Sequence, residues 1–151
     1  MHYIKTRQEL DEEITKETIL KETMIWESRI RTLRTMAASF LALEFYDLAF
    51  QMKRPLEKAS ENLARLYIAG YLTGCQDIDG MYQAFKLYPK IQIEENFIIP
   101  TGLAALAEDA RQLPLDFHVL QIEIEKGFVD RINEVFKELL KNRKELGSFI
   151  E

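Results

Sequence analysis

A long run of this 151-residue chain, from Gln8 to Lys53, contains neither proline nor glycine. Within it, mostly apolar positions recur in alternating steps of four and three residues, the spacing of one helix face packed on a neighbour. Thr6 precedes the run and Arg54-Pro55 follows it, so we predict one long helix between them. Because its length is above the globular average, a break or bend, with Ser39 as the nearest candidate, is the alternative. Its seam consists of Ile19, Thr23, Trp26, Ile30, Leu33, Ala37 and Phe40.

The next segments also have helical spacing, but glycine and acidic residues divide them. Small and apolar residues recur on one face between residues 56 and 73, which predicts a second helix. Residues 74–77 are typical of its C-cap and turn, because Gly74 tolerates a left-handed backbone. Asp77 or Asp79 then caps a short third helix over residues 80–87.

The segment from Pro89 to Pro100 is the least helical part of the sequence. Its β-branched and aromatic residues predict an extended clip or a minimal hairpin around Glu95-Asn96. Thr101 then caps a predicted helix over residues 103–110. A long last helix follows, capped by Asp116, with an inward stripe of Phe117, Ile124, Phe128, Ile132, Val135, Leu139 and Leu146.

These elements predict an all-α fold, an irregular bundle of about five helices in a single domain over residues 1–151. The first and last helices are the two long ones, and residues 89–100 form a short extended segment. Only 6 glycines and 4 prolines are present, so turns are few, which favours long helices over a many-stranded sheet.

Charge and cysteine content exclude several classes of protein. The formal net charge of −5 is unlike that of a nucleic-acid or anionic-membrane binder, so we expect neither partner. The most apolar stretch, from Met36 to Phe50, is too short to span a bilayer and carries two carboxylates. Cys75 is the only cysteine, and the N-terminus has no signal-peptide pattern, so we expect a cytoplasmic protein.

Two carboxylates interrupt the seam of the first helix. Continued beyond Phe40, the same spacing reaches Glu44, Asp47 and Gln51, whereas apolar residues lie on two other sides of the helix. A helix that is apolar on two sides is expected between layers, which predicts a buried polar site at these three residues. The alternative is that the seam rotates, and the carboxylates reach solvent or pair with Arg65 or Arg111.

Carboxylates three residues apart share a helix face and can hold one divalent ion. Glu9-Leu10-Asp11-Glu12 is followed by Glu44-Phe45-Tyr46-Asp47, and this order of pairs resembles that of MazG-like nucleotide pyrophosphohydrolases. The resemblance covers only these four positions. It implies an all-α, magnesium-dependent hydrolase that uses Glu44 and Asp47.

Arg29, Arg31 and Arg34 form the one basic cluster in the first half of the chain. They predict a docking patch for an acidic partner, or a solvated flank paired with Glu22 or Glu27.

No catalytic residue, metal ligand or cofactor is assigned, because the sequence assembles no nucleophile, acid–base pair or ligand set. We therefore predict a non-catalytic helical interaction or regulatory module, with a protein partner or self-association as a homodimer. The enzyme prediction stays open through its alternative, a small MazG-like hydrolase or a ligand-binding bundle built on Glu44 and Asp47. Burial of these two carboxylates separates the two hypotheses.

Overall fold

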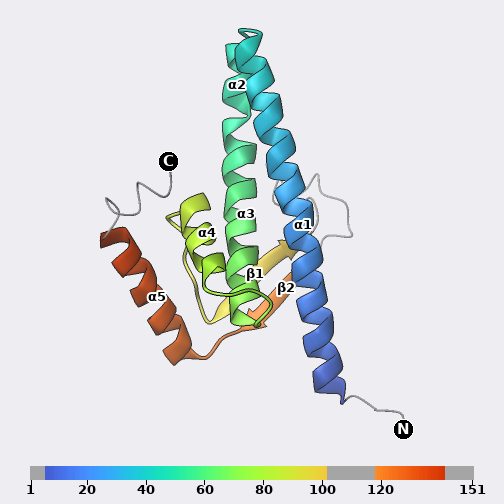
Figure 1. Cartoon of the computed structure of the whole chain (residues 1–151), viewed down its shortest axis with the longest axis vertical. Helices are drawn as coiled ribbons and strands as arrows, with labels where there is room; N and C mark the ends of the chain where they lie inside the picture. The colour runs from blue at the N-terminus through green and yellow to red at the C-terminus, as the bar shows by residue number, and fades with distance from the viewer. Residues whose placement is uncertain (1–5, 102–117, 142–151) are drawn as a thin grey trace.

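A computed structural model describes residues 6–101 and 118–141, and these residues are mostly helical with one two-stranded sheet (Figure 1). The fold class therefore agrees with the prediction. The elements in chain order are α1 (Arg7–Ala42), α2 (Tyr46–Gln51), α3 (Lys53–Leu72), α4 (Asp79–Leu87), β1 (Asn96–Thr101), β2 (His118–Glu123) and α5 (Lys126–Lys141).

Helix α1 starts next to Thr6, as predicted, and a capping box forms at this start. The Thr6 hydroxyl accepts a hydrogen bond from the Glu9 backbone N–H at 3.2 Å. The Glu9 carboxylate accepts one in return from the Thr6 N–H at 3.3 Å, which completes a capping box. Along the seam, Ile19, Thr23, Trp26 and Ile30 are buried, and the seam residues after Ile30 are half-buried.

The predicted helix to Lys53 is wrong, because the chain reverses at residues 43–45. The Phe45 N–H donates to the Phe40 carbonyl at 2.8 Å, and the Glu44 N–H donates to the Leu41 carbonyl at 3.1 Å. This hydrogen-bond pair is the Schellman motif, which requires a left-handed residue at its centre. Glu44 takes that conformation with φ 63°, although glycine normally fills the position. Sequence spacing alone therefore gave no sign of this helix end.

The reversed chain runs through α2 into α3, interrupted only at Met52, and packs antiparallel to α1. Pro55 does not end a helix as predicted. It lies in the first turn of α3, where the backbone N–H groups have no intrahelical partner. The two longest described helices are therefore α1 and α3, with 36 and 20 residues, instead of the first and last helices.

The end of α3 agrees with the prediction. Gly74, with φ 80°, occupies the left-handed position of a second Schellman motif, in which the Cys75 N–H donates to the Gly70 carbonyl at 2.8 Å. The close approach of α4 to α3 depends on Gly80. A side chain there would have its Cβ 3.2 Å from the Tyr67 carbonyl oxygen.

The extended segment is a strand, but its partner is not the one predicted. β1 pairs antiparallel with β2, in a register that sets Asn96 opposite Glu123 and Thr101 opposite His118. The hairpin around Glu95-Asn96 is therefore wrong, and so is a last helix that begins at Asp116 and includes residues 118–123. The predicted helix over 103–110 lies outside the described residues.

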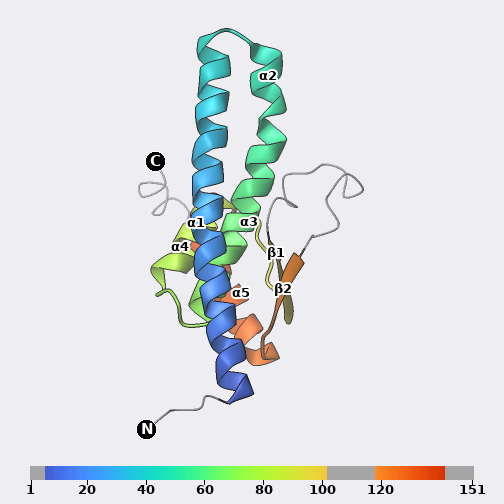
Figure 2. The ribbon, with the colours of Figure 1, turned by 90° about the vertical axis from the view of Figure 1, so that its right-hand side faces the viewer.

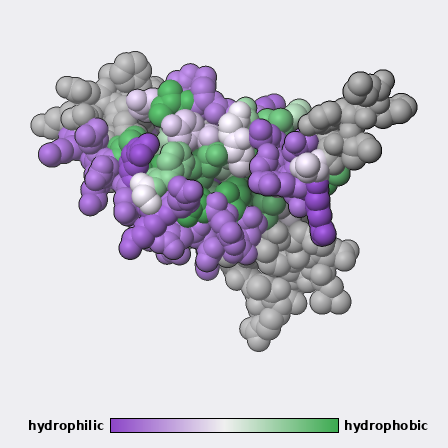
Figure 3. Space-filling view, turned by 90° about the horizontal axis from the view of Figure 1, so that it is seen from below, coloured by the Kyte–Doolittle hydropathy of each residue, from purple (hydrophilic) through white to green (hydrophobic). Residues whose placement is uncertain are grey.

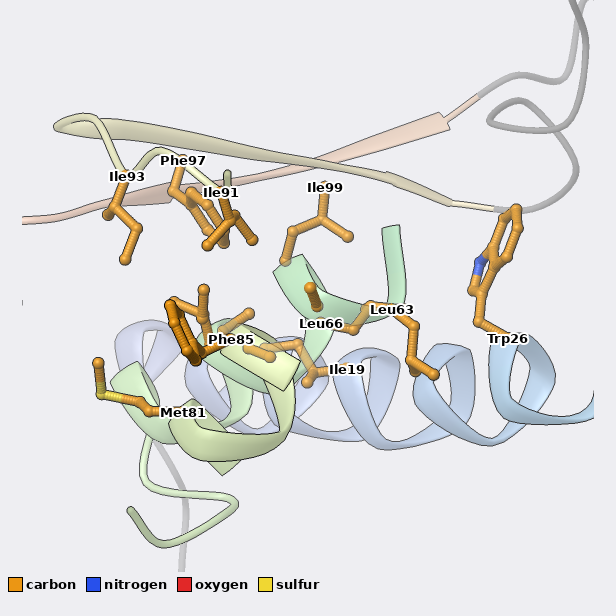
Figure 4. Packing of buried hydrophobic residues seen from close by; sticks show 14 of the residues in the cluster. Ile19, Trp26, Leu63, Leu66, Met81, Phe85, Ile91, Ile93, Phe97 and Ile99 are labelled. Carbon is orange, nitrogen blue, oxygen red and sulfur yellow. The ribbon is translucent and has the colours of Figure 1, made fainter. Parts of the chain in front are cut away.

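The core lies where the sheet covers the lower half of the α1–α3 pair. In Figure 4, Phe97 and Ile99 of β1 face Leu66 of α3 and Phe85 of α4. The described part of α5 adds Ile132 and Phe136, and the Phe136 ring lies 6.2 Å from that of Phe85. Seen from the end of the molecule opposite the turn, apolar residues form a central band with hydrophilic residues around it (Figure 3).

The distal half of the hairpin extends beyond this core. In both Figures 1 and 2, the end of α1 and α2 rise above α4, α5 and the sheet, and their main contacts are with each other and with the start of α3. We call residues 36–50 the hairpin tip.

Trp26→Ala should lower the free energy of unfolding by about 3–5 kcal/mol, because the ring is fully buried between α1, α3 and the end of β1. Met24→Ala is the matched control on the same helix, since this side chain is 72% exposed, and its effect should stay within about 0.5 kcal/mol. Urea unfolding of both variants measures the difference. Equal effects would contradict the position of the seam.

Candidate functional site

The hairpin tip carries a dense set of exposed apolar side chains. Phe50 is 75% exposed, Tyr46 is 63% and Leu43 is 62%. Met36, Leu41, Phe45 and Leu48 are also exposed, so apolar surface surrounds the turn. In the lower half of the hairpin, the apolar residues of α1 and α3 are buried under the sheet and α4. No described element covers the tip in the same way. Large apolar side chains that are exposed close together in this way are typical of interaction sites.

The three residues of the predicted polar site lie on this tip, and all three are exposed. Glu44 occupies the turn, Asp47 lies in the first turn of α2, and Gln51 is the last residue of α2. The expectation that they lie between helix layers is not met, because the chain reverses here instead of continuing into the core. The proposed partner Arg65 pairs with Glu61 at 3.3 Å, and Arg111 lies outside the described residues.

The two carboxylate pairs that resemble the MazG-like pattern lie at opposite ends of α1. Glu12 is near the start of this helix, and Glu44 follows its end. At 1.5 Å per residue the two pairs are separated by about 45 Å, so they cannot share one ion. Within residues 6–101 and 118–141, no three His, Cys, Asp or Glu side chains form a group suited to a metal ion.

A groove between α1, α3 and α4 lies next to the tip and has a volume of about 730 Å³. Ile30 and Leu63 from the core form part of its wall, together with Leu87. Arg31 and Arg34 border it from α1, and Lys86 borders it from α4; all three are exposed. We call this the basic groove, because its lining holds three cationic side chains and one carboxylate, Glu27.

Only two of the three predicted docking arginines line the basic groove. Arg29 is two positions before Arg31, which places it about 200° away around the helix. Its guanidinium lies 4.7 Å from the centroid of the Trp26 ring, where burial lowers the pKa of Arg29 and the charge of Glu22 opposes that shift. Arg29 therefore covers the core tryptophan. Lys86 was not predicted from the sequence, because only the packing of α4 on α3 brings it to the groove.

Tyr67 fixes the one carboxylate of the groove. Its hydroxyl donates a hydrogen bond of 2.8 Å to Glu27, from α3 to α1. Burial raises the pKa of the Tyr67 hydroxyl, and the hydrogen bond and negative charge of Glu27 raise it further. The Glu27 carboxylate is thus engaged by a neutral donor within the wall of the groove.

Two other grooves among the described residues are lined by charges of both signs. A groove between residues 89–94 and α5 has lining residues of both signs, including Lys90, Glu94, Asp130 and Lys137. Another, near the start of α1, is also lined by both signs. Of these three grooves among the described residues, only the basic groove has a lining in which one sign of charge predominates.

No family model, no curated protein and no solved structure matches this chain. Among the described residues, no helix combines the length and the apolar character needed to cross a membrane.

Tyr67→Phe tests the bond inside the groove wall. At neutral pH this change should lower the free energy of unfolding by about 1 kcal/mol, because Glu27 loses its donor. The folded-state pKa of Tyr67 lies above the unfolded value of about 10, so the unfolded chain loses its proton first as the pH rises. The advantage of the wild-type chain is therefore complete below about pH 9 and shrinks above about pH 10.

Urea unfolding of both chains at several pH values measures this difference. The pKa of Tyr88 is also raised by burial, but Tyr88 is present in both chains and its contribution cancels. A difference that does not change up to about pH 11 would contradict the hydrogen bond.

Glu44→Gly should raise the free energy of unfolding by about 1 kcal/mol, since glycine adopts the left-handed conformation without a steric penalty. Gly74→Ala at the equivalent position of α3 should lower it by a similar amount. An added Cβ at Gly74 meets no atom within 4 Å, so that effect is conformational. Chemical denaturation of the two variants measures both changes in the free energy of unfolding. A Glu44→Gly chain that is less stable than the wild type would refute the turn geometry.

Proposed function

We propose that this protein is a non-catalytic helical module for protein–protein interaction, and that the hairpin tip is its docking surface. The observation that supports the proposal most directly is the exposure of Leu43, Tyr46 and Phe50 on an element that stands clear of the core. Aromatic and large aliphatic side chains are enriched at the centres of interfaces, where they lose their contact with water on binding.

The backbone at Glu44 supports the same proposal. A non-glycine residue in the left-handed region costs stability, and such positions cluster where function requires a particular side chain. Gly74 shows that the chain uses glycine in the same motif elsewhere. A carboxylate at the apex of the tip therefore suits a role in recognition. The hydrolase alternative finds no comparable support, because its two carboxylate pairs lie at opposite ends of α1.

The proposal is tested with a tip variant, Leu43→Ser with Phe50→Ser, and a matched variant, Ile14→Ser with Met24→Ser. All four side chains are highly exposed, so both variants should fold as the wild type does. Each chain is immobilised at equal density, and the proteins retained from an extract of the producing cells are quantified. We expect a partner that the wild type and the matched variant retain and that the tip variant loses by about tenfold or more.

Circular dichroism first establishes that the three chains have the same helix content. Equal retention by the tip variant, or loss only in the matched variant, would place the docking surface away from residues 36–50.

A further inference from the structure

We infer that the partner of the hairpin tip is a second copy of this chain, and that each copy inserts its tip into the basic groove of the other. This inference rests on the proposed function, because it names the occupant of the same docking surface. It is carried by three observations: the charges of the tip and the groove, their separation along α1, and the apolar residues at both places.

The charges of the two surfaces are opposite. Glu44 and Asp47 are the only charged residues between Met36 and Met52, so the tip is acidic. The basic groove holds Arg31, Arg34 and Lys86, all exposed, and its one carboxylate already accepts a hydrogen bond from Tyr67. Two tips packed side by side would bring four carboxylates together, which is unfavourable. A tip in a groove instead places carboxylates beside guanidinium groups.

The spacing along α1 permits both contacts at once. Arg34 precedes Glu44 by ten residues and Arg31 precedes it by thirteen, which correspond to about 15 Å and about 20 Å of helix. In a symmetric dimer every contact is made twice, so an antiparallel overlap of this length brings each tip to the other groove. The midpoint between these arginines and Glu44, where the two copies of α1 would cross, falls next to Ala38. This small residue is exposed and lines the groove, so it lets two helices approach closely.

The apolar parts of the two surfaces also match. Leu43 and Phe45 flank Glu44 at the apex and are exposed. The wall of the groove includes Leu87 and the edges of Ile30 and Leu63, next to the basic side chains. An apolar tip with carboxylates at its apex therefore meets an apolar wall with cations at its rim. In this arrangement the two hairpins form a four-helix contact, and the exposed tip residues lose their contact with water.

The first test is the mass of the full chain in solution, measured by sedimentation equilibrium from low to high micromolar concentration. We expect a dimer with twice the 17.7 kDa of one chain, weakened by salt. A monomer over the whole range would overturn the inference. The proposed function would remain intact in that case if a different protein is retained through the tip.

Charge reversal then tests the pairing of tip and groove. Glu44→Lys with Asp47→Lys, and Arg31→Glu with Arg34→Glu, should each weaken the homodimer by about tenfold or more. Two controls carry the same charge changes on the exposed lower part of α1: Glu12→Lys with Glu17→Lys, and Lys16→Glu with Lys21→Glu. Both controls should dimerise as the wild type does.

An equimolar mixture of the two charge-reversed chains should form a heterodimer, since each tip then meets a groove of opposite charge. A single chain with all four substitutions should form a homodimer again, for the same reason. This rescue separates lost recognition from lost folding. A dimer that neither reversal weakens, or a mixture that stays monomeric, would overturn the inference.

Failure of the proposed function has a different signature. In that case Leu43→Ser with Phe50→Ser would alter neither the dimer nor the proteins retained from the extract.

Discussion

The contact between α1 and α3 forms the base on which α4 and β1 pack. Ile19, Trp26 and Ile30 on one helix meet Leu63 and Leu66 on the other, and this pair forms the surface on which α4 and β1 pack. Thr23 is the one polar member of the buried seam, and its hydroxyl donates to the Ile19 carbonyl at 2.6 Å, so it adds no unpaired group. The long hairpin is stable at its base because the sheet and helices cover it there. The tip at the other end therefore contributes little to the core, which suits the proposed docking role.

The sequence predicted the helices that depend on local signals. The helix start next to Thr6, the seam through Trp26 and the glycine cap at Gly74 were all predicted, because each uses residue types that its geometry favours. The turn at Glu44 was not readable for the opposite reason, since a glutamate occupies a glycine position. This one error put the predicted polar site between helix layers, whereas the alternative prediction, that the carboxylates reach solvent, agrees with their exposure.

The second strand was missed because two periodicities overlap there. Ile124, Phe128 and Ile132 have helical spacing, and extending that pattern backwards hid the strand before them. An alternating signal was present: Leu120, Ile122 and Ile124 are half-buried, and Gln121, Glu123 and Glu125, which each follow one of them, are exposed. The candidate site was predicted only in part, since the acidic residues and two of the arginines were identified from sequence. The acidic residues lie on the hairpin tip and the arginines line the basic groove. This separation depends on the chain reversal and on the packing of α4, which the sequence pattern did not predict.

The antiparallel course of the hairpin also has an electrostatic consequence at its apex. Helix α1 ends there and α2 begins there, so the negative end of one helix dipole lies beside the positive end of another. These partial charges oppose each other within a few residues of the turn. The field at the tip is then set by the full charges of Glu44 and Asp47, and any molecule that approaches the apex encounters two carboxylates on an apolar support.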